Sequence, residues 1–216
     1  MKTHIYFRSP CRQPSQKPAF QTGFSLVEVL ISIVILSFGL LGMVGLQAAA
    51  IQSNKEARLQ STAGALAREL AEMMRSNMVV ALGTTTATNP FLVNITSSGT
   101  PPAMAPATAS YCLNSSNTAV TCTSSIDVAN AQMTEWLTRV NAELPGARVV
   151  VCIDSAPFDA SGLPQWGCTP GATATYVVKL GWTRSSTDRS ANNTTPLERV
   201  AANPPSIIYP VTPGNS

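Results

Sequence analysis

Residues 23–54 read GFSLVEVLISIVILSFGLLGMVGLQAAAIQSN, an apolar stretch in which Glu28 is the only charged side chain. A carboxylate inside a lipid bilayer costs on the order of 2–3 kcal/mol or more, so such residues are rare and usually functional. The leader upstream contains no acidic residue and four basic ones, Lys2, Arg8, Arg12 and Lys17. Because Gly23 separates this basic leader from the apolar run, the pattern indicates a cut at Gly23 and a role for Glu28 afterwards.

The uncharged run from Val29 to Asn54 is long enough to cross a membrane. As a helix it extends roughly 39 Å, whereas the hydrocarbon core of a bilayer is ~30 Å thick. The basic leader is expected on the cytoplasmic side. Two simpler interpretations are an uncleaved signal anchor and a secretory signal peptide cut after the alanines at 48–50. The apolar region of a signal peptide is typically ~7–15 residues, and this run is longer.

The sequence G-F-S-L-V-E followed by an apolar run resembles the cleavage motif of type IV pilins and pseudopilins. The resemblance implies that a prepilin peptidase, a membrane aspartyl protease, cuts after Gly23 and N-methylates Phe24. It also implies that Glu28, the fifth residue after the cut, neutralises the N-terminal amine of a neighbouring subunit during assembly. The motif is specific because the glycine, the glutamate and the continuing apolar run must all coincide.

The first helix is predicted to continue beyond the membrane. After Lys55, apolar residues recur at the spacing of one helical face, and they are Leu59, Ala63, Leu66, Leu70 and Met73. The charged residues between them are placed to stay solvated, and they are Glu56, Arg58, Arg68, Glu69, Glu72 and Arg75. We therefore expect one helix from about residue 24 to about residue 77, with its apolar stripe packed on its own domain.

This interpretation divides the chain into four segments. They are a cleaved leader (1–23), the membrane or filament-core half of the helix (24–54), its amphipathic half (55–78), and a head domain outside the membrane (79–216). The expected fold is α+β and pilin-like, with the long helix packed on a small antiparallel sheet and a short second helix.

In the head domain the sequence predicts a second helix, two clear strands, a weaker strand and a long loop. A second helix is predicted to begin near Asp127 as its N-cap and to end at Pro145-Gly146. Its apolar face is Met133, Trp136, Leu137, Val140 and Leu144. Strands are predicted at 148–153 and 175–182, with an edge strand at best around 207–209 because prolines flank it. The region 83–125 is polar, lacks sustained alternation and is predicted to be a long loop.

Four cysteines lie on the exported side, because Cys11 falls in the leader. An even number outside the cytoplasm indicates disulfides, and four cysteines allow three pairings. We favour Cys112–Cys122 and Cys152–Cys168, because each pair closes a short polar loop. Zinc is the alternative, but thiolate pairs for zinc usually lie two to four residues apart.

The sequence shows no catalytic constellation, and we expect no enzyme activity, cofactor or metal. The only histidine, His4, lies in the leader, so the exported part lacks the commonest general base. Asp154 and Asp159 lack the spacing of a calcium loop and are interpreted as part of a solvated loop. Trp136, Trp166 and Trp182 are interpreted as core or loop anchors.

The charge of the exported part is balanced. The chain has 14 basic and 11 acidic side chains, which fall to ten of each once the four leader bases and Glu28 are set aside. Binding of nucleic acid is therefore not favoured as a bulk effect. A local basic patch formed by Arg184, Arg189 and Arg199 stays open as an alternative.

The order of the elements along residues 20–185 resembles minor pilins of the PilV type, also called type IV pilus modification proteins. The residues that carry the likeness are LGMVGLQ at 41–47, AEMMRSN at 71–77 and YVVKLGW at 176–182. After Thr183 the likeness ends.

The resemblance implies a low-abundance subunit that helps to initiate, prime or cap a type IV pilus and so supports adhesion or twitching motility. Its implied partners are other minor and major pilins, the prepilin peptidase and the inner-membrane assembly machinery. Its implied location is the bacterial inner membrane, as a single-pass protein with the C-terminal domain in the periplasm, and then the pilus. Two alternatives are a minor pseudopilin of a type II secretion system and a membrane-anchored periplasmic binding module.

Overall fold

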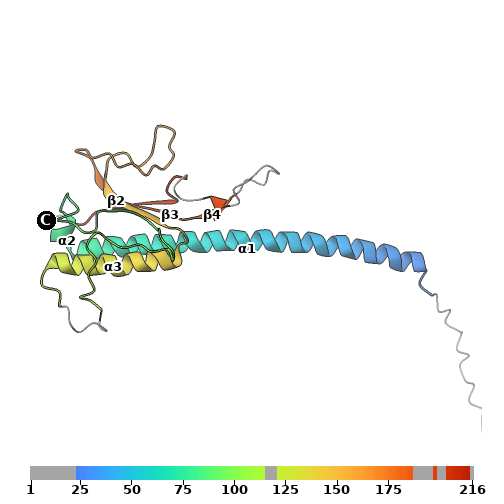
Figure 1. Cartoon of the computed structure of the whole chain (residues 1–216). Helices are drawn as coiled ribbons and strands as arrows, with labels where there is room; N and C mark the ends of the chain where they lie inside the picture. Colours follow the sequence, from blue (N-terminus) through green and yellow to red (C-terminus); the bar gives the residue numbers. More distant parts are fainter. Residues whose placement is uncertain (1–22, 115–120, 187–196, 199–202, 215–216) are drawn as a thin grey trace, which may run out of the picture. The chain divides into compact units, whose positions relative to one another are not determined.

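The computed structural model describes residues 23–114, 121–186, 197–198 and 203–214 (Figure 1). The chain forms two compact units, Met1–Ala49 and Ala50–Ser216. Helix α1 (Leu26–Ser76) is 51 residues long, as the sequence predicts. Its apolar part is long and apolar enough to cross a membrane by length and composition. From Leu26 to Lys55 its side chains are exposed, and its buried residues begin at Ala63.

The main sheet has four antiparallel strands in the order β1-β2-β3-β6. Their bounds are Val93–Thr96 (β1), Arg148–Asp154 (β2), Thr175–Gly181 (β3) and Ile207–Val211 (β6). Two central strands were predicted from their apolar runs, and the outer strand β6 agrees with the predicted edge strand. A second small sheet pairs β4 (Arg184–Ser185) with β5 (Leu197–Glu198).

One face of the main sheet packs on the helices to form the core. Successive side chains of a strand point to opposite faces, and the residues of β2 and β3 in the core are Val149, Val151, Val178 and Leu180. In Figure 1 the C-terminal part of α1 runs beside α3 (Ser125–Glu143), with the sheet over α1. The predicted stripe of α1 contributes Ala63, Leu66 and Leu70, with Leu59 and Met73 partly buried beside them.

Trp136 joins the two helices within this core. Its side chain is fully buried, and its indole Nε1 donates a hydrogen bond to the carbonyl oxygen of Leu66 at 3.1 Å. Most buried indole N–H groups have such an acceptor. The predicted apolar face of the second helix is therefore confirmed as its core face, with Met133, Leu137, Val140 and Leu144 also buried.

The prediction that Asp127 caps the second helix is wrong by one turn. Helix α3 begins at Ser125, and the hydroxyl of Ser124 accepts a hydrogen bond from the backbone N–H of Asp127 at 3.1 Å. The carboxylate of Asp127 instead accepts hydrogen bonds from the backbone N–H and the hydroxyl of Thr123. Serine and aspartate both suit helix starts, so the sequence pattern located the terminus without identifying its cap.

The predicted end of the second helix agrees with the structure. Its last residue is Glu143, and Gly146 follows Pro145 with a positive φ of 57°. A Cβ at Gly146 would lie only 2.5 Å from the hydroxyl oxygen of Thr183. Glycine is required here both for its backbone conformation and for the close approach of another segment.

The region 83–125 is not wholly irregular, which corrects the sequence prediction. It contains strand β1, which pairs with β2 at one edge of the sheet. Short helix α2 (Met78–Ala81) precedes it. Asn89 lies between α2 and β1 and is buried. Its side-chain amide donates hydrogen bonds to the carbonyl oxygens of Ala81 and Gly83 and accepts one from the backbone N–H of Phe91. One asparagine thus satisfies the backbone of a turn that leads the chain into β1.

Candidate functional site

Phe24, two residues before α1, and Glu28, in the first turn of α1, line one shallow groove together with Ser32. The helix begins as the backbone N–H groups of Glu28 and Val29 donate to the carbonyl oxygen of Ser25. Phe24 is 84% exposed, and Glu28 is also exposed. Within α1, the spacing of four residues places Glu28 and Ser32 on one side of the helix.

In the apolar part of α1, the serine hydroxyls form hydrogen bonds within the helix, whereas the carboxylate of Glu28 does not. The hydroxyls of Ser32 and Ser37 donate to the carbonyl oxygens of Glu28 and Ile33, each at 2.7 Å. The carboxylate of Glu28 has no hydrogen bond or ion pair within the described part of the chain. A negative side chain in the first turn suits the helix dipole, but in an apolar setting it still needs a positive partner.

The fold does not explain why residue 23 is glycine. A Cβ built there meets no atom within 4 Å, and its φ is not positive. The glycines at 39, 42 and 45 likewise have open space around them. Among the described residues, no contact or backbone conformation requires glycine at position 23.

The head domain contains two disulfides, Cys112–Cys122 and Cys152–Cys168, with Cα–Cα distances of 5.1 and 6.4 Å. These are the pairs that the sequence analysis favours. Cys152, Asp154 and Cys168 do bring potential metal-ligating atoms within 4.8 Å of one another. Both sulfurs are already bonded to each other, however, so neither is a free thiolate that would bind zinc.

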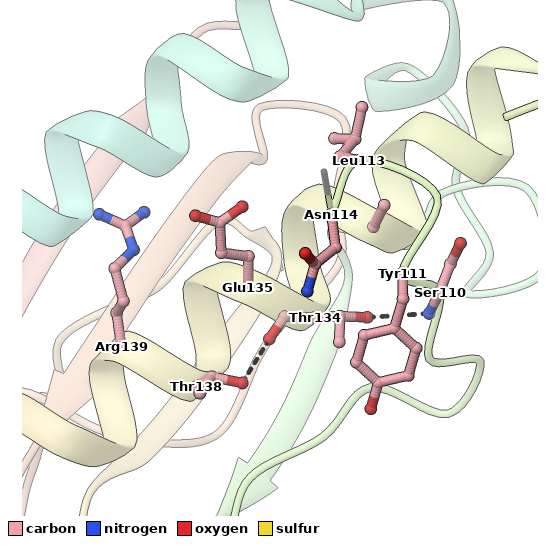
Figure 2. A pocket seen from close by; sticks show the side chains of 9 residues that line it. Ser110, Tyr111, Leu113, Asn114, Thr134, Glu135, Thr138 and Arg139 are labelled. Carbon is pink, nitrogen blue, oxygen red and sulfur yellow. Dashed lines mark hydrogen bonds between the residues drawn. The ribbon is translucent and has the colours of Figure 1, made fainter. Parts of the chain in front are cut away.

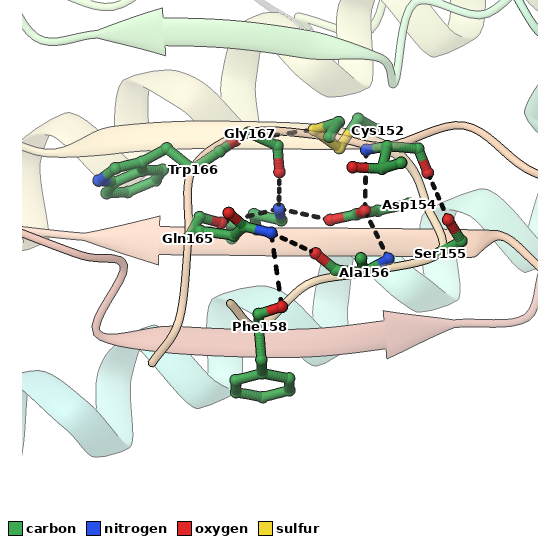
Figure 3. A network of polar contacts seen from close by, with 11 residues as sticks. Cys152, Asp154, Ser155, Ala156, Phe158, Gln165, Trp166 and Gly167 are labelled. Atoms are coloured by element: carbon green, nitrogen blue, oxygen red, sulfur yellow. Dashed lines mark hydrogen bonds and ion pairs between the residues drawn. A yellow bond between two sulfur atoms is a disulfide. The ribbon is translucent and has the colours of Figure 1, made fainter. Parts of the chain in front are cut away.

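A buried ion pair lies on the face of the sheet away from the helices. Lys179 in β3 and Asp154 in β2 are both 0% exposed, and the Lys179 Nζ is 2.6 Å from the Asp154 Oδ2. The ammonium group also contacts Gln165 and Gly167, which Figure 3 shows in one polar network with Asp154. Nζ donates to their carbonyl oxygens at 2.8 and 2.5 Å. All three donors of the ammonium group are therefore used.

This network holds the segment 155–174 over the sheet. The other carboxylate oxygen of Asp154 accepts hydrogen bonds from the backbone N–H groups of Ala156 and Thr169, each at 2.9 Å. The Cys152–Cys168 disulfide fastens the same segment to β2. Burial raises the pKa of Asp154, but the hydrogen bonds from Lys179, Thr169 and Ala156 outweigh it, so its pKa lies below the usual value.

The interpretation of Asp154 as a solvated loop residue is thus wrong. Asp154 is the last residue of β2 and is buried, whereas Asp159 is exposed and accepts hydrogen bonds from the backbone N–H groups of Ser161 and Leu163. The sequence analysis also missed Lys179. Its signal was a lone lysine within the apolar strand TYVVKLG, where the side chain needs a buried partner.

The three tryptophans occupy structural positions. Trp136 and Trp182 are buried in the core, and Trp166 lies under the guanidinium of Arg148, 4.5 Å from its ring centroid. Of the basic patch considered from the sequence, Arg189 and Arg199 lie outside the described residues. His4, Cys11 and the four basic leader residues also lie outside the described residues.

A family model described as the prokaryotic N-terminal methylation motif matches residues 19–44. No curated protein matches the chain. No solved structure matches it. The match covers the glycine, the glutamate and the start of the apolar helix. Together with the long helix packed on a small antiparallel sheet, it supports a structural protein of the type IV pilin or pseudopilin kind, anchored by its N-terminal helix.

Proposed function

We propose that this protein is a minor pilin of a type IV pilus that helps to initiate, prime or cap assembly, and so supports adhesion or twitching motility. The observation that carries the proposal is the exposed pair Phe24 and Glu28 in one groove at the start of an apolar helix. The motif match at residues 19–44 supports it. The likeness of the head segments to PilV-type proteins favours a minor pilin over a major one.

Processing is the first step of the proposed mechanism. The basic leader holds the precursor in the inner membrane until a prepilin peptidase cuts after Gly23. The cut releases a new α-amino group on Phe24, which is then methylated. In this mechanism Gly23 is the residue that the peptidase recognises, and no contact among the described residues gives it another role.

Charge neutralisation is the second step. The Phe24 ammonium of one subunit pairs with the Glu28 carboxylate of a neighbour when their apolar helices pack together. Each group alone is costly to bury, and an opposite charge within hydrogen-bond distance offsets that cost. Incorporation into the filament is therefore favoured only when both groups are present, and the disulfide-tied head then faces outward.

Domain bounds follow from this mechanism as part of the proposal. Residues 24–54 form the filament-core half of the helix, residues 55–78 its amphipathic half, and residues 79–216 the head outside the membrane. The leader, residues 1–23, is absent from the mature protein.

The first experiment is the intact mass and N-terminal peptide of the protein from native membranes or sheared pili. A chain that starts at methylated Phe24 supports the proposal. A chain that starts at Ile51 is a secreted domain, and one that starts at Met1 is an uncleaved membrane protein. Either of these starts contradicts both the pilin route and the role of Glu28.

A variant tests the role of Glu28 directly. Glu28→Ala should be processed normally but should fail to co-purify with other pilins in sheared filaments, because the neighbour's amine stays unpaired. Ser32→Ala is the matched control, since Ser32 lines the same groove and its hydroxyl bonds only within the helix. Normal incorporation of Glu28→Ala would disprove the mechanism. Complementation of strains that lack minor pilins or minor pseudopilins separates the pilus from type II secretion.

A further inference from the structure

Arg148, the first residue of β2, carries a positive charge that no acidic side chain among the described residues neutralises. Within these residues its side chain forms neither a salt bridge nor a hydrogen bond, and its buried Nε has no partner. By contrast, Arg139, which extends from α3 in Figure 2, pairs with Glu69, and Arg75 pairs with Glu72. The guanidinium of Arg148 is therefore available to an anion from another molecule.

The ring of Trp166 holds this guanidinium in place. The Cζ atom lies 4.5 Å from the centroid of the ring, within the ~6 Å reach of a cation–π contact. The indole Nε1 donates to the carbonyl oxygen of Asn203 at 2.7 Å. The ammonium of Lys179 binds the carbonyl oxygens of Gln165 and Gly167, the residues on either side of the tryptophan. Figure 3 shows Trp166 beside Gly167 at one end of this network. The guanidinium is thus positioned before a ligand arrives, which favours binding.

Two polar side chains of β1 lie on the same face of the sheet as Arg148. The register places Thr96 opposite Arg148 and Asn94 opposite Val150. Residues directly opposite each other in an antiparallel pair have Cβ atoms ~4.5–5.5 Å apart. Both β1 side chains are exposed and have no hydrogen bond to other described residues. The Thr96 hydroxyl and the Asn94 amide can each donate, so hydrogen-bond donors gather beside a fixed positive charge.

These groups favour a carboxylate as the ligand. A guanidinium presents parallel N–H donors that match the two oxygens of a carboxylate or of a phosphate. The single charge of Arg148 balances one carboxylate, whereas a phosphate monoester carries about −1.5 to −2 at pH 7. Asp154, the acidic residue of β2, lies about 20 Å farther along the strand. It already pairs with Lys179 and does not compete for the site.

The free edge of β1 indicates that the carboxylate belongs to another protein. Strand β1 is the outermost strand of the main sheet, and no described strand pairs with its other side. Its core-side residues Val93 and Ile95 are only partly buried. An edge strand presents N–H and C=O groups to which an extended segment of a partner can bind. A free carboxylate gains little from an exposed ion pair in water, whereas such a segment adds backbone hydrogen bonds.

We propose that Arg148, stacked on Trp166, and Thr96 of the edge strand bind an acidic side chain from an extended segment of a partner protein. The guanidinium binds the carboxylate, and the Thr96 hydroxyl donates to one of its oxygens, while the segment lies along β1. This site goes beyond the role proposed for the N-terminal helix and does not depend on it, because all of its residues belong to the unit Ala50–Ser216.

The test is a titration of the full mature protein in a zwitterionic detergent with the blocked peptide Thr-Val-Glu-Val-Thr. Its counterparts have glutamine or phosphoserine at the central position. NMR of the indole N–H signals reports binding, and the Trp166 signal is the one that Trp166→Phe lacks. The glutamate peptide should shift this signal, and the glutamine peptide should bind at least about tenfold more weakly, because the charge-assisted hydrogen bonds are lost.

Three variants locate the site. Arg148→Gln should weaken binding of the glutamate peptide at least about tenfold, and Arg148→Lys should weaken it too because an ammonium lacks the planar fork. Thr96→Val should weaken it about threefold. Arg68→Gln is the matched control, an exposed arginine on α1 whose loss should leave the affinity unchanged. Urea unfolding curves check that the Arg148 variants fold, and Thr96→Val, a change of an exposed side chain, decides if they do not.

Four outcomes overturn the proposal. They are no shift of the Trp166 signal, equal affinities for the glutamate and glutamine peptides, tighter binding of the phosphoserine peptide, and an affinity that neither Arg148→Gln nor Thr96→Val changes. Sodium acetate that saturates the site at the same concentration as the glutamate peptide would also overturn it, because the ligand would then be a free carboxylate. The titration uses purified protein, so its failure is distinct from normal incorporation of Glu28→Ala into pili.

Discussion

Replacement of Lys179 by methionine should destabilise the head domain by about 3–5 kcal/mol, the cost of breaking a buried ion pair from one side. The wild-type ammonium donates hydrogen bonds at 2.6, 2.8 and 2.5 Å to Asp154, Gln165 and Gly167. Methionine fills similar space but donates none. The substitution leaves a buried carboxylate with only its two backbone N–H partners, and two carbonyl oxygens lose their donor.

The expected loss of stability follows from the number of these hydrogen bonds and from their burial. A hydrogen bond to a charged group contributes about 1.5–3 kcal/mol, and the three bonds together are reduced by the cost of burying the ammonium. The carboxylate of Asp154 is 0% exposed, so water does not replace the lost partner. Because a domain of this size is stabilised by about 5–15 kcal/mol in all, the loss is a large share.

The assay is unfolding of the full chain in urea, followed by tryptophan fluorescence with the disulfides intact. Trp136 and Trp182 are buried in the core and report global unfolding. The matched control is Glu72→Gln, which removes an ion pair whose glutamate side chain is 69% exposed and should cost less than about 1 kcal/mol. If Lys179→Met costs no more than this control, the ammonium does not hold the segment 155–174 and the reasoning is wrong.

A double variant separates the pair from the rest of the packing. Asp154→Asn removes the negative charge, so Lys179→Met should cost less in that background than in the wild type. The two residues are in contact, and such pairs show coupling energies of about 0.5–3 kcal/mol. Simple additivity of the two costs would contradict a direct interaction.

Three further predictions concern acid, a helix cap and processing. The pKa of Asp154 is lowered in the folded chain. The stability that its carboxylate contributes is therefore complete above the unfolded pKa of ~3.9 and is lost as the pH falls through the folded value. Asp154→Asn should make the unfolding free energy depend less on pH in this acid range. Ser124→Ala should lower the unfolding free energy by about 1 kcal/mol in urea, because the N–H of Asp127 loses its acceptor. Gly23→Glu should leave the precursor at its full mass in membranes, and a processed Gly23→Glu chain would exclude the proposed cut.

The parts of the fold that the sequence predicted are those with a local pattern. Helix α1 shows an apolar run and then a stripe, α3 has an apolar stripe and a Pro-Gly stop, and β2 and β3 are apolar runs. Strand β1 was missed because Val93–Thr96 alternates over only four residues and is stabilised by pairing with β2, more than 50 positions away. The two-residue strands β4 and β5 are too short to show a period.

The site was predictable where its chemistry lies in consecutive residues. Gly23, Phe24 and Glu28 form a motif that can be recognised without a structure. The Lys179–Asp154 pair is different, because two long-range arrangements create it. The strand register places Lys179 opposite Val150 and on the same sheet face as Asp154, and a returning loop then covers that face. A contact that depends on strand register and on a distant loop cannot be predicted from a local sequence pattern.

The N-terminal motif and the core of the head domain are expected to serve different properties of the protein, filament assembly and stability of the fold. Gly23, Phe24 and Glu28 are exposed and lie in the unit Met1–Ala49, whereas the core, both disulfides and the buried ion pair lie in Ala50–Ser216. A substitution at Glu28 removes no contact from the head core. It should therefore leave the urea midpoint unchanged while abolishing incorporation, whereas Lys179→Met should lower the midpoint and leave processing at Gly23 intact. If the two effects always appear together, incorporation is governed by head stability, and the charge on Glu28 is not the determining factor.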